Sequence, residues 1–199
     1  MSISASAVKE LRDKTNAGMM DCKNALTQCD GDLEKAVDWL RQRGLSLASK
    51  RADRQSSEGQ VMTYVHGGGK LGVMVEINCE TDFTGKTEEF TQFARDVAMQ
   101  IAATNPVCID IDDMPASVLE REKEVYLGQV RESGKPEKIW DKIIEGKVQK
   151  FYSESCLVQQ TFVKDPDKTI ADLLNEMRAK TGENVQIRRF VRFALGEQS

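Results

Sequence analysis

The spacing of apolar residues along this sequence changes near Gly59. Before that point, apolar residues recur three or four positions apart, which is the period of helices with one buried face. After it, apolar and polar residues alternate, which is the period of strands with one face on a core. Helical spacing then returns for most of the remaining chain, and a last alternating stretch lies near the C-terminus. The pattern therefore predicts a helical N-terminal part and a mixed second part.

Residues 1–45 are predicted to form a compact unit of three helices. Ser4 can cap the first helix, and Asn16-Ala17-Gly18 ends it. Gly44 closes the third helix. Each helix carries its apolar residues on one stripe: Val8 and Leu11 in the first, Met19, Cys22, Leu26 and Cys29 in the second, and Leu33, Val37 and Leu40 in the third.

Residues 46–58 are polar, charged and rich in serine, and we interpret them as a helical extension that fades into a linker. The segment contains the basic residues Lys50, Arg51 and Arg54. Three positive charges followed at once by acids are typical of a solvated face, and they are weak support for a nucleic-acid site.

Residues 59–199 are predicted to form an α+β core domain. A hairpin is expected first, with Val61, Thr63 and Val65 alternating before the turn at 66–70, and Leu71, Val73, Val75, Ile77 and Cys79 after it. Helices are expected at 88–104, 115–132, 136–155 and 170–181, with a connecting loop at 162–166. A last strand, 184–195, carries Val185, Ile187, Val191, Phe193 and Leu195 on one face, which only Arg189 interrupts. Three strands separated by helices predict an antiparallel sheet covered on one side.

The composition argues against nucleic-acid binding, membrane insertion and export. The chain has 199 residues, a formal net charge of -4, 40% apolar residues and 30% charged residues, which suits a soluble globular protein. A net negative charge gives no support for a broad phosphate-binding surface, so no direct contact with nucleic acid is expected. No apolar run approaches a membrane span, and the N-terminus has neither an apolar signal core nor transit-peptide character. We therefore expect a cytoplasmic protein.

Candidate catalytic and metal-binding residues are few. Five scattered cysteines without a C-x-x-C pair indicate reduced thiols, and a single histidine, His66, makes a zinc site improbable. The Gly67-Gly68-Gly69-Lys70 turn does not match a phosphate-binding loop, because it joins two strands and Leu71 follows the lysine. We expect no catalytic residue, no metal and no cofactor.

One stretch has no obvious structural purpose. Thr81-Asp82-Phe83 lies between the second predicted strand and the helix at 88–104. Threonine and aspartate are ordinary cap and turn residues there. Phe83 leaves two alternatives: it folds back into the core, which the usual burial of phenylalanine favours, or it is displayed to a partner.

A second candidate surface lies near the first predicted helix break. Met19 and Met20 are both candidates for the core, but successive helical positions lie about 100° apart, so both cannot easily face inward. An exposed methionine beside an exposed Arg12 would form a soft, adaptable contact.

These two stretches carry a resemblance to a known family. LRDKTNAGMMDCKNAL, at 11–26, and EINCETDFTGK, at 76–86, resemble the two signatures of the elongation factor Ts family, with Thr84 where valine is usual and Gly85 where alanine or serine is usual. GKPEKIWDKIIEGKVQKFYSESCLVQQTFVKDPDKTIADLL, at 134–174, and TGENVQIRRF, at 181–190, are similar to later parts of the family. The resemblance implies a ubiquitin-associated-like three-helix domain at 1–45 and a single core repeat, as in short members that form homodimers.

The resemblance also implies a function. Members of this family exchange guanine nucleotide on the translational GTPase elongation factor Tu. Carried over, Phe83 is an apolar wedge between two helices of the GTPase, Asp82 is its polar neighbour, and Thr81 positions the loop. The neighbouring Thr84 is included in the predicted contact. Arg12, Met19 and Met20 match the family's docking surface.

Two other classes of function remain as alternatives. A holding or chaperone module would bind the GTPase without exchanging its nucleotide, and the altered residues Thr84 and Gly85 leave room for it. An enzyme would need paired carboxylates, a nucleophile with a base, or a metal cluster, and the sequence offers none of these.

Overall fold

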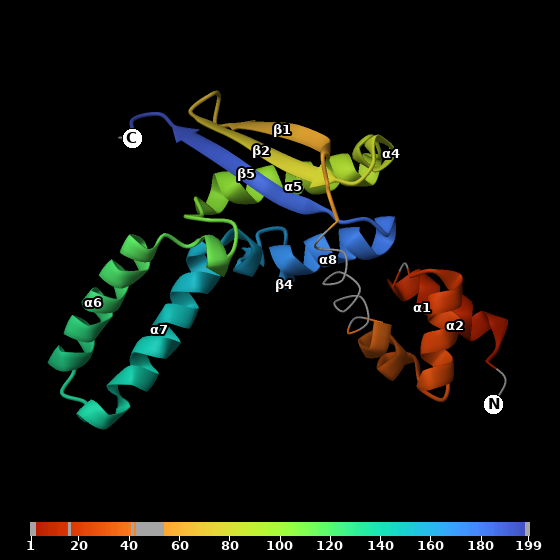
Figure 1. Cartoon of the computed structure of the whole chain (residues 1–199), viewed down its shortest axis with the longest axis horizontal. Coiled ribbons are helices and arrows are strands. Elements are labelled where there is room, and N and C mark those ends of the chain that lie inside the picture. The colour runs from red at the N-terminus through yellow and green to blue at the C-terminus, as the bar shows by residue number, and fades with distance from the viewer. Residues whose placement is uncertain (1–2, 16, 41, 43–53, 198–199) are drawn as a thin grey trace. The chain divides into compact units, whose positions relative to one another are not determined.

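The structure of the chain is a computed structural model that describes residues 3–15, 17–40, 42 and 54–197 (Figure 1). The predicted α+β fold is confirmed: a three-helix N-terminal region precedes a core with a three-stranded antiparallel sheet and helices. The chain divides into two compact units. The first contains Met1–Gly59, Asn78–Gly85 and Leu174–Gln186, and the second contains Gln60–Ile77, Lys86–Leu173 and Ile187–Ser199.

The N-terminal region contains α1 (Ala5–Thr15), α2 (Met19–Gln28) and a third helical segment that includes residues 33–40. Ser4 caps α1 as predicted, because the backbone N–H of Ala7 donates to its hydroxyl at 3.2 Å. The three helices enclose a small core of apolar side chains: Val8, Leu11, Cys22, Ala25, Leu26 and Ala36.

One expectation for this region was wrong, and another lies outside the described residues. The placement of Met19 on the buried stripe of the second helix was wrong, since Met19 is 59% exposed while Cys22 and Leu26 are fully buried. It begins α2, where the preceding turn leaves its side chain outside the small core. The predicted helix end at Gly44 and most of the predicted linker, with Lys50 and Arg51, lie outside the described residues.

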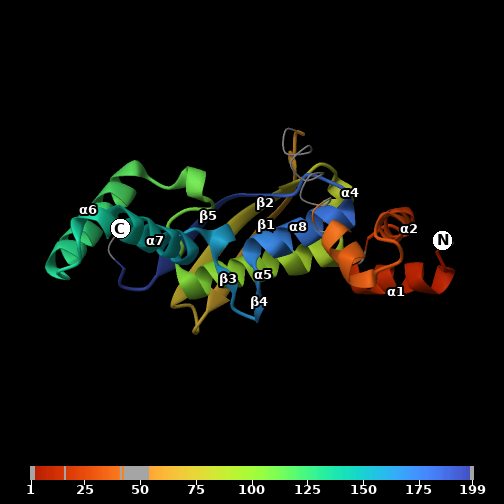
Figure 2. The ribbon, with the colours of Figure 1, turned by 90° about the horizontal axis from the view of Figure 1, so that it is seen from below.

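The main sheet consists of β1 (Glu58–His66), β2 (Leu71–Cys79) and β5 (Gln186–Ala194), in the order β1-β2-β5. Helix α5 (Glu88–Thr104) lies along one face of this sheet (Figures 1 and 2). It begins at its capping residue Thr87, whose hydroxyl accepts from the N–H of Phe90 at 3.3 Å. Its buried face matches the predicted one: Phe90, Phe93, Ala94, Val97, Ala98 and Ile101.

Side-chain contacts identify which strand residues face α5. The Gln60 amide of β1 donates to Thr91 at 3.0 Å, and Arg192 of β5 donates to the carbonyl of Ala102 at 3.5 Å. In β2, Val73, Val75, Ile77 and Cys79 are buried, as expected, and Leu71, predicted on the same face, is half-buried. Because neighbouring residues in a strand point to opposite faces, the remaining positions lie on the other side of the sheet.

We call that other side the open sheet face, and we define it as Val61, Thr63, Val65, Met74, Glu76, Arg189, Val191 and Phe193. Its apolar side chains are exposed, with Phe193 at 71%. The residues that the sequence analysis placed on one face between Val185 and Leu195 differ in how far they are covered. Val185 is buried, whereas Val191, Phe193 and Leu195 are exposed. Arg189 fits its place because it pairs with Glu76 of β2, and β5 is an edge strand.

The rest of the second unit contains a helical hairpin. Helices α6 (Ala116–Glu132) and α7 (Trp140–Ser155) lie side by side (Figures 1 and 2), close to their predicted bounds. Short 3-10 turns occur at Ile111–Asp113, Glu137–Ile139 and Leu157–Gln159. The backbones of Cys108 and Cys156 pair in an isolated parallel β-bridge between the segments before α6 and after α7, and both thiols are free.

The loop predicted at 162–166 is instead part of a second, two-stranded sheet. Strands β3 (Thr161–Phe162) and β4 (Asp165–Thr169) pair antiparallel. The first strand is too short for alternation to be visible in the sequence. Helix α8 (Ile170–Thr181) follows, and ends where Thr181-Gly182 predicted. Within the described residues, we find no helix long and apolar enough to span a membrane.

Candidate functional site

The Thr81-Asp82-Phe83 stretch forms a projecting loop between β2 and α5. It contains a single-turn helix, α4 (Asp82–Gly85), on which Asp82 and Phe83 are neighbours. The side chain of Phe83 is 78% exposed. The burial that is usual for phenylalanine therefore predicted the wrong alternative here, and the display of the ring is the one observed. A large ring this exposed contributes little to the stability of its own chain.

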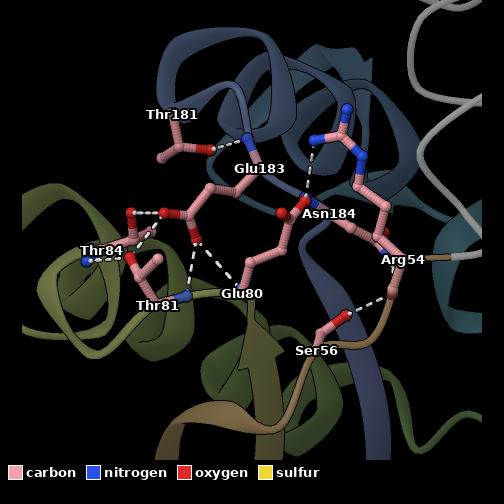
Figure 3. Close-up of polar contacts among 8 residues, drawn as sticks. All are labelled: Arg54, Ser56, Glu80, Thr81, Thr84, Thr181, Glu183 and Asn184. Carbon is pink, nitrogen blue, oxygen red and sulfur yellow. Dashed lines mark hydrogen bonds and ion pairs between the residues drawn. The ribbon is translucent and has the colours of Figure 1, made fainter.

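The carboxylate of Glu183 holds this loop in place (Figure 3). Its Oε2 atom accepts from the backbone N–H groups of Glu80 at 3.0 Å and of Thr81 at 3.1 Å. Its Oε1 atom accepts from the hydroxyls of Thr81 at 2.6 Å and of Thr84 at 2.7 Å. Hydrogen bonds to an ionised acceptor are stronger than those between neutral groups. One side chain therefore connects both ends of the segment that carries Asp82 and Phe83.

The end of α8 explains how Glu183 reaches the loop. Gly182 adopts the left-handed conformation, with φ of 74°, and its N–H donates to the carbonyl of Arg178 at 3.0 Å. This is the usual way in which a glycine ends a helix and redirects the chain. The N–H of Glu183 then donates to the hydroxyl of Thr181 at 3.3 Å. The turn brings the next side chain to residues 80–84.

A second acid, Glu80, extends the network (Figure 3). Its Oε1 atom accepts from the backbone N–H of Asn184 at 2.7 Å and lies 3.5 Å from Nη1 of Arg54. The side-chain amide of the buried Asn184 donates to the carbonyl of Arg54 at 2.8 Å. The base of the loop is thus linked both to the segment before β1 and to the segment before β5.

The two residues that depart from the family signature both lie in α4. Thr84 is 5% exposed, and its hydroxyl makes one of the four bonds to Glu183. Gly85 is buried against Gly59, and a Cβ atom at position 85 would lie 3.2 Å from the Cα atom of Gly59. Such a contact is tight, so the glycine permits close approach of α4 to the start of β1. Helix α5 begins only after Thr87, so neither departure lies in that helix.

The electrostatics around the loop favour an ionised Glu183. Partial burial acts to raise the pKa of this carboxyl, but the hydrogen bonds from Thr81, Thr84 and the backbone of Glu80 lower the pKa below its ordinary value. The neighbouring thiol of Cys79 behaves in the opposite way. Burial, together with the negative charge of Glu183, raises the pKa of Cys79 to about 11.

The predicted docking residues of the N-terminal helices are exposed. Arg12 lies in the last turn of α1, and Met19 and Met20 begin α2. Met19 is 59% exposed and Met20 is 66% exposed, so both methionines are on the surface, where at least one was expected. These three residues are candidates for contact with a partner protein, as is the loop that carries Phe83.

The sequence analysis named the loop residues Thr81 to Thr84 but not Glu183. Glu183 lies 102 residues after Thr81, and no local period or motif links the two. The only signal near it was the Thr181-Gly182 helix stop, which predicts a change of chain direction but not its target.

Comparisons with known proteins give the context of this site. A family described as elongation factor TS matches residues 4–197. An elongation factor Ts of Desulfosudis oleivorans is 65% identical over 195 residues, covering 98% of each chain. That of Desulfotalea psychrophila is 59% identical over 196 residues, and that of Syntrophobacter fumaroxidans is 57% identical over 198 residues; the coverage is at least 98% in both.

The fold defines an α+β protein in which a three-helix N-terminal region precedes a three-stranded antiparallel sheet with helices. The family model and the relatives match nearly the full length of the chain. The chain belongs to the elongation factor Ts family.

Proposed function

We propose that this protein is a guanine-nucleotide exchange factor for elongation factor Tu, which promotes the release of GDP so that GTP can bind. Family membership supports the coarser assignment, a role in translation elongation. The observation that carries the finer proposal is the exposed ring of Phe83 on a loop anchored by Glu183. An apolar side chain presented on an anchored loop is suited to insertion into a partner.

The proposed mechanism requires no covalent chemistry on this chain. In a GTPase, the phosphate loop and Mg²⁺ hold the nucleotide tightly. An exchange factor binds the nucleotide-free form better than the loaded form, because only a difference in affinity shifts the equilibrium. We propose that Phe83 enters a space between helices of elongation factor Tu and that Asp82 makes the adjacent polar contact. The distortion that follows weakens the metal and nucleotide sites.

The energy available from one aromatic ring is large enough for this role. Full burial of a phenylalanine side chain is worth about 2 kcal/mol, and a hot-spot contact up to about 4 kcal/mol. Since about 1.4 kcal/mol corresponds to a factor of ten in an equilibrium constant, this ring alone can change nucleotide affinity by one to three orders of magnitude.

A second contact with the same partner is proposed for Arg12, Met19 and Met20. Exposed methionines adapt their shape to a partner surface, and arginine is enriched at the centre of interfaces. All three side chains are exposed, which is the condition for such a contact. Thr81 and Thr84 take part by holding the loop through Glu183.

We also propose that the protein is a homodimer in the cytoplasm, with the open sheet face as the interface. The face exposes Val61, Val65, Met74, Val191 and Phe193. On the same face, Arg189 and Glu76 neutralise each other, with Nε 2.6 Å from Oε2. A second copy of the chain offers the same apolar side chains and the same neutral pair, so that two copies can meet without charge repulsion.

The direct test is the release of a fluorescent GDP analogue from elongation factor Tu, with and without this protein. Acceleration of release supports the exchange function. Binding to elongation factor Tu without acceleration contradicts it and supports the alternative, a holding or chaperone module.

A further inference from the structure

We infer that Glu183 is the positioning residue of the displayed loop, so that its carboxylate sets the direction in which Phe83 is presented and thereby the affinity for the partner. This inference rests on the proposed function, and it concerns a residue outside both signature stretches. Glu183 is not proposed to touch the partner. It acts through Glu80, Thr81 and Thr84.

The carboxylate is fully used in this task. An ionised carboxylate has about four lone-pair positions for accepting hydrogen bonds. Four donors occupy them, and all four come from the segment 80–84: the N–H groups of Glu80 and Thr81 and the hydroxyls of Thr81 and Thr84. Two bonds fix the backbone before α4, and the bond from the Thr84 hydroxyl fixes the end of α4. Asp82 and Phe83 lie between these attachment points.

The helix α4 cannot fix the ring by itself. It has four residues, and an isolated helix of that length is unstable in water. The ring of Phe83 is 78% exposed, so packing on its own chain does not hold it either. Restraint must therefore come from contacts made by the flanking residues, and Glu183 makes four of those in Figure 3.

A restrained loop binds more tightly than a free one. When a partner binds a mobile loop, the loss of conformational freedom reduces the affinity, and a loop that is already ordered avoids most of that loss. The order of the loop affects all complexes with the partner equally, from the first complex to the one that releases GDP. A change in this order is therefore expected to change the concentration of this protein needed for half-maximal exchange, with little change in the maximal rate.

The hydroxyl of Thr84 supplies one of the four bonds to Glu183. Valine has nearly the shape of threonine but no hydroxyl. Thr84→Val is therefore a mild variant that removes one of the four bonds and leaves the other three. It keeps the buried volume at position 84, which is 5% exposed.

The test uses four variants of the full chain. Glu183→Ala removes all four bonds. Glu183→Gln keeps the shape, because its amide oxygen can accept from the two N–H groups while its NH₂ donates to the two hydroxyls, which can also accept. Thr84→Val removes one bond. Glu145→Ala removes an exposed carboxylate on α7 and is the matched control.

Two measurements separate positioning from a merely structural role. The first is hydrogen exchange of the amides in segment 80–85 of the free protein, with chemical unfolding to establish that each variant is folded. The second is GDP release from elongation factor Tu at increasing concentrations of each variant, which gives the half-maximal concentration and the maximal rate separately.

We expect Glu183→Ala to lose protection in segment 80–85 and to raise the half-maximal concentration by about tenfold, with the maximal rate changed by less than about twofold. Thr84→Val should raise the half-maximal concentration by about twofold to threefold. Glu183→Gln should have a half-maximal concentration close to that of the wild type. Glu145→Ala should match the wild type in both measurements.

Specific results would overturn the inference. Wild-type half-maximal concentrations in both Glu183→Ala and Thr84→Val would do so, as would full protection of segment 80–85 in Glu183→Ala. If Glu183→Ala does not fold, Thr84→Val alone decides, and an unchanged half-maximal concentration in it contradicts the inference. Failure of the exchange function is distinguishable: the wild type itself then does not accelerate GDP release, while amide protection still reports whether Glu183 orders the loop.

Discussion

Thr81 and Glu183 are 102 residues apart in the sequence and are joined by two hydrogen bonds, one from the backbone N–H and one from the hydroxyl of Thr81. This double contact connects the loop after β2 to the turn after α8. The displayed residues Asp82 and Phe83 follow Thr81 directly. The displayed loop therefore depends on the C-terminal third of the chain for its conformation, although its residues lie in the first half.

The first prediction concerns pH. Because the pKa of Glu183 is lower in the folded protein than its ordinary value of 4.5, the stabilisation that its ionised form provides is fully present above that value. It is lost as the pH falls from about 4.5 through the lowered pKa. Amide protection of segment 80–85, taken relative to the intrinsic exchange rate at each pH, should fall in this window in the wild type. Glu183→Gln should show no such step, and a step of equal size in both proteins would contradict the assignment.

A second prediction separates the two displayed side chains. Asp82→Ala should reduce GDP release from elongation factor Tu, but by less than removal of the phenylalanine ring. The reason is that an exposed polar contact contributes less than burial of an aromatic side chain. Exchange kinetics of this variant at a fixed concentration measure the effect. A rate equal to that of the wild type rules out a role for this carboxylate.

The cysteines provide a third prediction. Burial and the neighbouring thiol of Cys108 raise the pKa of Cys156 to about 12, and burial raises the pKa of Cys108 as well. Since the thiolate is the reactive form, both should react with iodoacetamide at pH 8 far more slowly in the folded protein than in the unfolded chain. Cys29, which is partly exposed, should be labelled first.

Peptide mass spectrometry of samples taken over time gives the rate at each cysteine. The unfolded chain, labelled under the same conditions in denaturant, is the control. Labelling of Cys156 at the same rate in folded and unfolded protein would show that its environment is not the one described here.

A fourth prediction tests the open sheet face. Phe193→Glu places a charge at a position that is 71% exposed in the single chain, so it should not disturb the fold. In a dimer formed through this face the charge would be buried, which is costly. Light scattering should give twice the chain mass of 22.3 kDa for the wild type and a single chain mass for the variant.

The matched control for this experiment is Val163→Glu. Val163 is an exposed apolar residue in the turn between β3 and β4, and its N–H donates to Gln100 of α5, the helix on the covered face of the sheet. It should leave the dimer intact. A wild-type protein that remains a single chain at micromolar concentration contradicts the proposed dimer, and dissociation by both variants contradicts the proposed interface.

Much of the fold could be predicted because its elements are long and strongly periodic. The bounds of α5 match the prediction, since its apolar face recurs over 17 residues. The strands of the hairpin were equally clear, because alternation in β2 produces one face that is buried from Val73 to Cys79. Phe193 shows the limit of such patterns. Alternation indicates which residues share a face, but it does not indicate whether that face is covered.

The candidate site was predictable only in its local part. Phe83 stood out because a large ring in a loop between a strand and a helix needs an explanation. Whether that ring is buried depends on contacts from distant segments, and a single sequence does not reveal them. Glu183 was missed for the same reason: a polar contact across 102 residues leaves no periodic signal in either segment.

The most direct test of the account is GDP release from elongation factor Tu by wild type and by Phe83→Ala. The ring is exposed, so the free energy of unfolding of the variant should equal that of the wild type within about 0.5 kcal/mol. Loss of an aromatic wedge should lower exchange by about tenfold or more. Wild-type exchange in a correctly folded Phe83→Ala would contradict the central claim. So would early unfolding of the variant, since it would show that Phe83 supports the fold instead of contacting the partner.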